Sequence, residues 1–208
     1  MQKERQTERR KMEDEKRRTA RKEVFSWVRM FAIVIIVVFV LTQFIIINAK
    51  VPSGSMENTI MTHDRLIGFR FAYWFDEPQR GDIILFEYPV DEKQIYIKRV
   101  IGLPGETVEI RDGHVYIDGS DEPLQEDYLK EEWTWENDGY TFVVPEGCYF
   151  VMGDNRNDSL DGRLWAGEAL KSGVASTPEE AEQYSYVRKD KIKGKAIFKY
   201  FSKFAILK

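Results

Sequence analysis

The stretch VPSGSMENTI, residues 51–60, contains a hydroxyl, that of Ser55, that could act as a nucleophile. Its Pro-Ser-Gly-Ser composition is equally typical of an ordinary connecting loop. A serine hydroxyl is inert near neutral pH unless a neighbouring base accepts its proton. The usual base is histidine, but His63 lies in a polar loop and His114 follows an Asp-Gly turn, positions typical of surface residues. The chemistry of Ser55 therefore depends on another base.

Lysine is the other side chain that can serve as this base, provided that burial removes its charge. Lys98 lies in the apolar segment QIYIKRVIG, residues 94–102, whereas most other lysines stand among charged neighbours. Strand alternation places Lys98 on one face with Tyr96, and Arg99 on the other. One face must bury a cation, unless the strand lies at a sheet edge where Lys98 reaches solvent. As a base, Lys98 needs a pKa lowered from about 10.4 to about 7 or 8.

A polar loop follows a predicted strand and has the sequence MGDNRNDSLDGRLW, residues 152–165. Such composition is usual for a solvated surface loop. Four of its charged residues could instead pair with one another or with Arg99: Asp154, Arg156, Asp161 and Arg163. These pairs would make the loop rigid and hold Ser159 in one position, where its hydroxyl could orient a neutral lysine.

Other chemistries have little support in the sequence. There is no His-rich, Cys-rich or HExxH-type cluster, so we expect neither a metal nor a cofactor. Ser-x-x-Lys and Gly-x-Ser-x-Gly motifs are also missing. Cys148 is the single cysteine, which excludes an intrachain disulfide. From Lys50 onward the chain is acidic, with 20 Lys or Arg against 29 Asp or Glu, and we expect no nucleic-acid partner.

The N-terminal part divides into a charged tail and an apolar segment. Residues 1–24 contain ten Lys or Arg and six Asp or Glu, which predicts a solvated tail that is partly helical or disordered. Residues 25–48 include an uncharged run from Met30 to Ile47, long enough to span a bilayer as a helix. The basic flank predicts a cytoplasmic N-terminus and an extracytoplasmic domain. Asn48 and Pro52 make a poor cleavage site, so we expect an uncleaved single-pass anchor.

Residues 49–208 are predicted to form one mostly β domain. Short runs rich in Ile, Val, Tyr and Phe alternate with glycine turns, and Asp112-Gly113 is a strong hairpin signal. Residues 166–187 break this pattern as an inserted segment. Within it, Thr177, Pro178 and Glu180 have the spacing of a helix N-terminus, which predicts a short exposed helix.

Three segments, PSGSM, YIKRVIGLPGE and GDNRNDSLDGR, occur in this order, with RGDIILFEYP between the first two and an anchor before them. Together they resemble the bacterial type I signal peptidases, which are membrane-anchored Ser/Lys endopeptidases. The likeness covers the chain from Lys50 onward, except the insertion after Trp165. It implies a fold of antiparallel β-sheets with the site in an exposed groove, at the bacterial cell membrane.

The resemblance implies roles for individual residues. Ser55 would be the nucleophile and Lys98 the general base. The Ser55 N–H and the Ser53 hydroxyl would form the oxyanion hole, and Ser159 would hydrogen-bond the lysine amine. Two ion pairs would brace the loop, Asp161 with Arg163 and Asp154 with Arg99.

The resemblance also implies the substrate: signal peptides of secretory pre-proteins, bound as an added strand between residues 49–53 and residues 96–97. Small pockets would select Ala-x-Ala-like cut sites. We expect these residues to line them: Val51, Pro52, Met56, Ile60, Tyr96 and Ile97. The other expected partner is the lipid bilayer, and we expect a monomer.

Two departures from the family pattern concern the polar loop. The order Asn157-Asp158 reverses the more usual one, and Gly162 stands where serine is common. Two alternative functions also stay open. One is a self-cleaving Ser/Lys protease of related fold, although such proteins lack a membrane span. The other is a membrane-anchored β binding module without catalysis.

Overall fold

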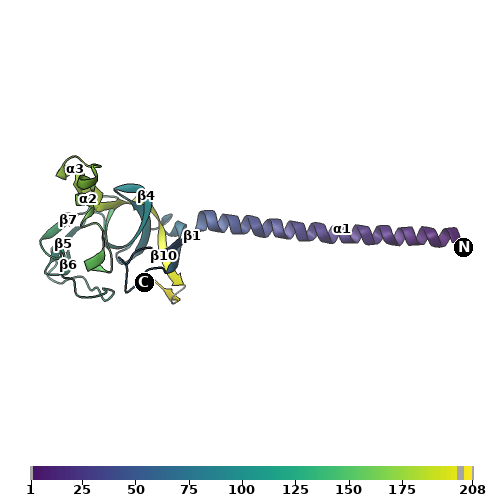
Figure 1. The fold of residues 1–208 in the computed structure, drawn as a ribbon, viewed down its shortest axis with the longest axis horizontal. Helices are drawn as coiled ribbons and strands as arrows, with labels where there is room; N and C mark the ends of the chain where they lie inside the picture. The colour runs from purple at the N-terminus through teal and green to yellow at the C-terminus, as the bar shows by residue number, and fades with distance from the viewer. Residues whose placement is uncertain (1, 201–203, 208) are drawn as a thin grey trace. The chain divides into compact units, whose positions relative to one another are not determined.

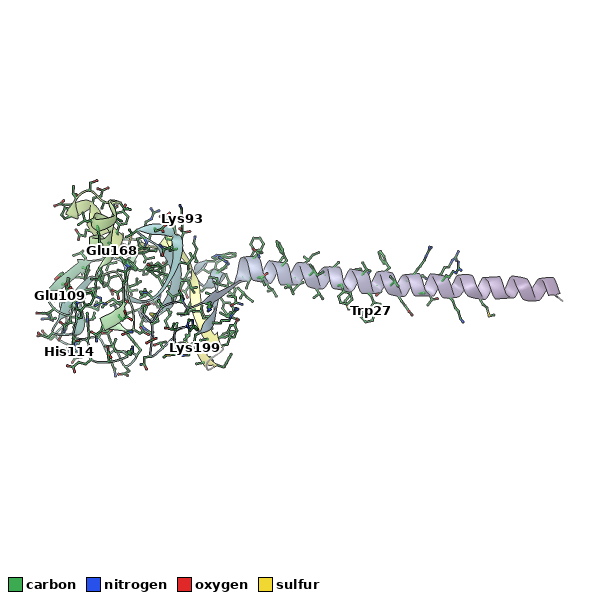
Figure 2. The ribbon with its side chains drawn as sticks, in the orientation of Figure 1. Trp27, Lys93, Glu109, His114, Glu168 and Lys199 are labelled. Atoms are coloured by element: carbon green, nitrogen blue, oxygen red, sulfur yellow. The ribbon has the colours of Figure 1, made fainter. Side chains whose placement is uncertain are left out.

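The structure, a computed structural model, describes residues 2–200 and 204–207. It divides into two units, residues 1–45 and residues 46–208. The first is helix α1 (Gln2–Val40), continued by a π-helical turn, η1 (Leu41–Ile45) (Figure 1). In the described part of the chain, Lys16–Ile45 is the one helical segment long and apolar enough to cross a membrane. Its apolar side chains are exposed, and Trp27 projects away from the helix (Figure 2).

The helical segment ends earlier than the sequence analysis predicted. We expected the span to continue to residue 48, but helical structure ends at Ile45. Ile46, Ile47 and Asn48 are extended and pair with Phe69, Gly68 and Ile67. Apolar composition alone could not separate these strand residues from the helix before them, since both are rich in isoleucine.

The second unit consists of two antiparallel sheets, which confirms the predicted mostly β fold. The larger sheet has the order β1-β2-β10-β3-β4-β8-β9, with β11 paired to β10. Its strands are β1 (Ile46–Lys50), β2 (Arg65–Phe69), β3 (Ile83–Tyr88), β4 (Asp91–Gly102), β8 (Cys148–Met152), β9 (Tyr186–Arg188), β10 (Ile192–Tyr200) and β11 (Ala205–Ile206). The smaller sheet has the order β6-β5-β7, formed by β5 (Thr107–Arg111), β6 (His114–Ile117) and β7 (Tyr140–Val143).

The predicted hairpin is present. Asp112 and Gly113 have φ angles of 48° and 76°, and Arg111 pairs directly with His114 across the turn. Two residues with positive φ give the tight turn that matches the twist of the two strands. His114 is exposed on this hairpin (Figure 2), as its position after the turn predicted.

The inserted segment holds two helices rather than one. Helix α3 (Pro178–Glu182) begins as predicted, because the Thr177 Oγ1 accepts a hydrogen bond from the Glu180 N–H at 3.2 Å. Helix α2 (Trp165–Ser172) was not predicted. The segment is also less exposed than expected, since Ala169, Ala175 and Ala181 form a small buried cluster. Short 3-10 turns complete the fold: η2 (Arg70–Tyr73), η3 (Arg156–Asp158), η4 (Gln183–Ser185) and η5 (Lys189–Lys191).

Strand β4 lies inside the larger sheet and carries both cations noted in the sequence. It pairs with β3 on one side and β8 on the other, with Lys98 opposite Ile84 and Arg99 opposite Ile83 and Met152. The edge-strand alternative for Lys98 is therefore wrong. Both cations are buried, with exposed fractions of 4% for Lys98 and 2% for Arg99, so the strand buries a cation on each face rather than on one.

Candidate active site

Ser55 lies in a closed loop between β1 and β2. The Val51 N–H donates to the Asp64 carbonyl at 2.9 Å, and the His63 N–H donates to the Val51 carbonyl at 2.9 Å, which closes the loop. Val51, Met56 and Ile60 point into the core below it. The apolar residues interleaved with the polar ones therefore anchor the loop and fix the position of Ser55.

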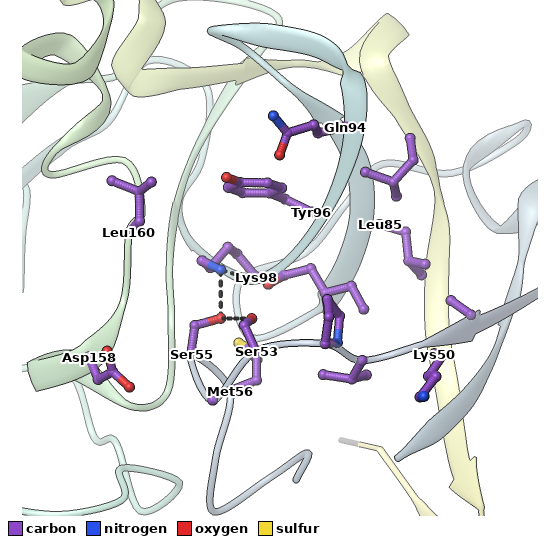
Figure 3. A pocket seen from close by; sticks show the side chains of 16 residues that line it. Lys50, Ser53, Ser55, Met56, Leu85, Gln94, Tyr96, Lys98, Asp158 and Leu160 are labelled. Carbon is purple, nitrogen blue, oxygen red and sulfur yellow. Dashed lines mark hydrogen bonds between the residues drawn. The ribbon is translucent and has the colours of Figure 1, made fainter. Parts of the chain in front are cut away.

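Lys98 reaches Ser55 from strand β4, which is separated from β2 by β10 and β3 in the sheet. Its Nζ lies 2.8 Å from the Ser55 Oγ and donates a second hydrogen bond to the Ile97 carbonyl at 3.1 Å (Figure 3). Burial lowers the pKa of Lys98 to about 8, which the carboxylates of Asp161 and Asp154 oppose and Arg163 reinforces. The amine can therefore be neutral at mildly alkaline pH, which is the state that accepts a proton from a hydroxyl.

The two groups predicted for the oxyanion hole lie beside the nucleophile. The Ser53 Oγ is 3.5 Å from the Ser55 Oγ, and Ser53 is exposed to the groove. Among the described residues, the Ser55 N–H has no hydrogen-bond acceptor. The Ser55 carbonyl instead accepts from the Asn155 N–H at 3.0 Å, which orients this peptide unit. A donor N–H and a hydroxyl near the attacking oxygen are what an oxyanion requires.

Ion pairs brace the polar loop that follows β8. Asp154 binds Arg99 through two hydrogen bonds of 2.9 and 2.7 Å, and Asp161 binds Arg163 through two of 2.8 and 3.0 Å. Burial acts to raise the pKa of Asp161, but Arg163 and the Gly153 N–H hold it below its ordinary value. Both predicted pairs are therefore formed, and charged side chains that would be costly to bury alone are compensated.

Arg156 pairs with a residue that the sequence analysis did not consider. Its guanidinium donates to the Glu126 carboxylate at 3.0 and 2.6 Å, rather than to Asp154 or Asp161. The exposed fractions of the two side chains are only 1% and 6%. Glu126 lies in the long connection between β6 and β7, and no local spacing links it to the loop. Only the tertiary fold reveals this pair.

Ser159 is buried beside the site but does not make the predicted bond. The Lys98 amine donates to the Ser55 hydroxyl and the Ile97 carbonyl, and no hydrogen bond joins it to the Ser159 Oγ, which lies near the Asp161 carboxylate. It packs closely on Gly153, where an added Cβ would lie 2.2 Å from the Ser159 Oγ. The structure thus places Ser159 next to the site without assigning it to the lysine.

A groove of about 510 Å³ opens over Ser55 and Lys98. Its lining includes residues 49–56 and residues 94–98, which contain the two segments predicted to flank a substrate, residues 49–53 and 96–97. Asp158 and Leu160 close it at a third side (Figure 3). Val51, Pro52, Met56, Tyr96 and Ile97 all line the groove, as expected. Ile60 does not, because its side chain is fully buried in the core beneath.

The connection between β6 and β7 holds the nucleophile loop and the polar loop together. The Asn58 side chain donates to the carbonyls of Tyr128 and Leu129 at 3.0 and 3.1 Å. Lys130 forms an ion pair with Glu57 at 2.9 Å, and its N–H donates to the Asp154 carbonyl at 3.3 Å. These residues carry no signal in the sequence, since nothing in their types distinguishes them from an ordinary acidic loop. No group of three or more His, Cys, Asp or Glu side chains in the described part of the chain could hold a metal ion.

The structure gives a local reason for both departures in the polar loop. The Asn157 side-chain amide accepts from the Thr134 and Trp135 N–H groups at 2.9 and 3.2 Å and donates to Glu131 and the Glu132 carbonyl at 2.9 and 2.8 Å. An aspartate there could not make the last two bonds. At Gly162, a Cβ would lie 2.8 Å from both the Phe150 ring and the Ser185 carbonyl.

Gly162→Ser should therefore destabilise this protein, although the resemblance noted from the sequence implies a serine at this position. Overpacking of this kind costs about 1–3 kcal/mol of unfolding free energy. Urea unfolding followed by circular dichroism measures the loss. Gly167→Ser is the matched control, because nothing lies within 4 Å of a Cβ at Gly167. Equal stability of the two variants would show that the space at Gly162 is larger than described.

Comparison with known proteins gives a consistent result. A family model described as signal peptidase, peptidase S26, matches residues 24–201. A probable signal peptidase I-1 of Synechocystis sp. is 43% identical over 64% of this chain and 69% of its own length. A signal peptidase I of Bacillus licheniformis is 35% identical over 81% of this chain and 93% of its own length. A crystal structure of a signal peptidase I from Enterococcus faecalis is 36% identical, with a TM-score of 0.42, and covers 58% of this chain and 97% of that one. The family model and the Bacillus relative show that the chain is a peptidase and belongs to the signal peptidase family, peptidase S26.

Proposed function

We propose that this protein is a membrane-anchored serine endopeptidase that removes signal peptides from secretory pre-proteins, with Ser55 as nucleophile and neutral Lys98 as general base. The observation that carries the proposal is the 2.8 Å contact between the Lys98 Nζ and the Ser55 Oγ, at the base of a groove with two extended walls. Membership of a peptidase family excludes the non-catalytic binding module.

The proposed reaction follows from this geometry. Lys98 accepts the Ser55 proton as the Ser55 Oγ attacks the carbonyl carbon of the scissile bond. The negative charge that develops on the carbonyl oxygen is stabilised by the Ser55 N–H and the Ser53 hydroxyl. The protonated Lys98 then gives its proton to the leaving amine. Water, deprotonated by the neutral lysine, hydrolyses the acyl-enzyme and restores the Ser55 hydroxyl.

The groove walls explain which peptides would bind. Backbone groups of residues 49–53 and 94–97 face a groove in which an extended peptide can add as a strand, and pockets between alternate side chains give specificity. Val51 and Met56, both nearly fully buried, form an apolar floor near Ser55 that leaves little depth. Small side chains such as alanine suit such pockets.

The location belongs to the same proposal. The exposed apolar helical segment that ends at Ile45 anchors the protein in the bacterial cell membrane. Its basic flank places residues 1–24 in the cytoplasm and the β domain outside. A secretory precursor held in the same membrane would meet the site in two dimensions, which raises the effective concentration.

A direct test is cleavage of a synthetic pre-protein peptide with an Ala-x-Ala site by the full chain in detergent micelles. Mass spectrometry should find one cut, directly after the second alanine, and Ser55→Ala enzyme should give none. No product at pH 9, where most of the Lys98 amine is neutral, would contradict the proposal.

The pH dependence of cleavage follows from the lowered pKa of Lys98. Below about pH 8 the amine is protonated and cannot act as a base, so kcat/KM should fall about tenfold per pH unit on the acid side. It should reach a plateau above about pH 9. Peptide hydrolysis from pH 6 to 10 measures the profile, with circular dichroism at each pH to confirm folding. A flat profile across this range would exclude Lys98 as the base.

A further inference from the structure

A second hollow adjoins the catalytic groove. Its volume is about 320 Å³, and its lining comes from two segments, the polar loop and the β6–β7 connection. Asp158 and Leu160 line both this hollow and the groove over Ser55. The two depressions therefore meet at these two residues.

The hollow has an apolar wall and an acidic rim. Trp135 and Leu160 are exposed to 47% and 36%, and Leu164 is half-buried beside them. The carboxylates of Asp158 and Glu131 are exposed near this wall. Exposed apolar surface bordered by charge is characteristic of a binding site for a peptide or protein.

Hydrogen bonds hold this hollow in shape before any ligand arrives. The Trp135 N–H donates to the Asn157 side chain at 3.2 Å, and the Trp135 carbonyl accepts from the Trp133 indole at 2.6 Å. Asn157 in turn donates to the Glu132 carbonyl at 2.8 Å. A site fixed in this way loses little conformational entropy on binding.

We propose that this hollow binds the residues immediately after the scissile bond, the first residues of the released product, and favours an apolar side chain there. The inference rests on the proposed function. The peptide before the cut lies between the walls formed by residues 49–53 and 94–97. Asp158 and Leu160 line the opposite side of Ser55, so we place the peptide after the cut across these two residues (Figure 3). An extended chain advances about 3.3 Å per residue, so the first few residues reach the hollow. The acidic rim disfavours a carboxylate among them.

The test uses soluble peptides that are identical up to the cut and carry leucine, alanine or glutamate at each of the next four positions. At one position, kcat/KM for the leucine peptide should exceed that for the alanine peptide by roughly fivefold. Trp135→Ala should reduce this ratio to near one. Trp74→Ala is the matched control, since Trp74 is 66% exposed but lines neither depression, and should keep the ratio. Asp158→Asn should reduce the disadvantage of the glutamate peptide.

A binding measurement separates this proposal from the proposed function. Fluorescence anisotropy of labelled peptides with Ser55→Ala enzyme reports affinity without cleavage. Cleavage without a leucine preference, or with a preference that survives Trp135→Ala, overturns the subsite and leaves the peptidase assignment intact. Absent cleavage by wild-type enzyme, together with tighter binding of the leucine peptide that depends on Trp135, overturns the assignment of function and supports the subsite. If the wild-type enzyme does not cleave and the leucine peptide does not bind more tightly, both the subsite and the proposed function are overturned.

Discussion

Lys98→Met and Lys98→Arg should each lower kcat/KM for peptide cleavage by about 10⁴-fold, the upper range for loss of a general base. Methionine has a similar length but no basic atom. Arginine keeps the charge, and a guanidinium does not deprotonate in a protein, so it cannot accept the Ser55 proton. Ser55→Ala should be equally inactive. Initial rates with a quenched fluorescent peptide at pH 9 measure all three variants, and appreciable cleavage by Lys98→Arg would contradict the mechanism.

A stability measurement on Lys98→Met separates loss of the base from loss of folding as the cause of its inactivity. The pKa of Lys98 is lowered from 10.5 to about 8, so between these values the unfolded chain binds more protons and stability rises with pH. Below about pH 8 the amine is charged in both states, and burial of this charge lowers the free energy of unfolding by about 3 kcal/mol. Lys98→Met removes this burden and should be more stable than wild type at pH 6, with the gain disappearing near pH 11. Urea unfolding at both pH values tests this, and lower stability of the variant at pH 6 would contradict it.

The elements predicted best are those encoded by local pattern. Alternating apolar residues identified the strands, and Asp112-Gly113 and Thr177 identified a turn and a helix start through backbone effects that act within four residues. The end of the helix at Ile45 was harder to predict from the sequence. Whether Ile46 joins the helix or a strand depends on its partner Phe69, which is distant in sequence.

The burial of Lys98 and its contact with Ser55 could not be predicted from the pattern of residues alone. Alternation showed that Lys98 and Arg99 face opposite sides of a strand, but not that β4 has neighbours on both sides. The family likeness supplied the pairing of Ser55 with Lys98, which no spacing within the chain implies. The ion pair of Glu126 with Arg156 and the full burial of Ile60 could not be predicted either, because both depend on contacts between segments that are distant in sequence.

Asp161→Ala should lower the free energy of unfolding by about 3–5 kcal/mol, the effect of breaking a buried ion pair. The side chains of Asp161 and Arg163 are both fully buried, and the substitution leaves a guanidinium in the interior without its carboxylate. It also removes the acceptor of the Gly153 N–H, which lies 2.9 Å from the Asp161 Oδ2. Urea unfolding at pH 7 gives the loss. Glu168→Gln is the control, because its pair with Lys171 is exposed and contributes less than about 1 kcal/mol.

The same carboxylate also sets the basicity of Lys98, which gives a readout that a purely structural role would not move. Asp161 and Asp154 raise the pKa of Lys98 whereas Arg163 lowers it, so a neutral residue at 161 removes one of the two opposing carboxylates and leaves the Arg163 cation in place. Asp161→Asn, which keeps the shape of the side chain, should therefore shift the acid limb of the kcat/KM profile to lower pH. A profile that stays at the wild-type position, or moves to higher pH, would show that the Asp161–Arg163 pair braces the loop without acting on the lysine.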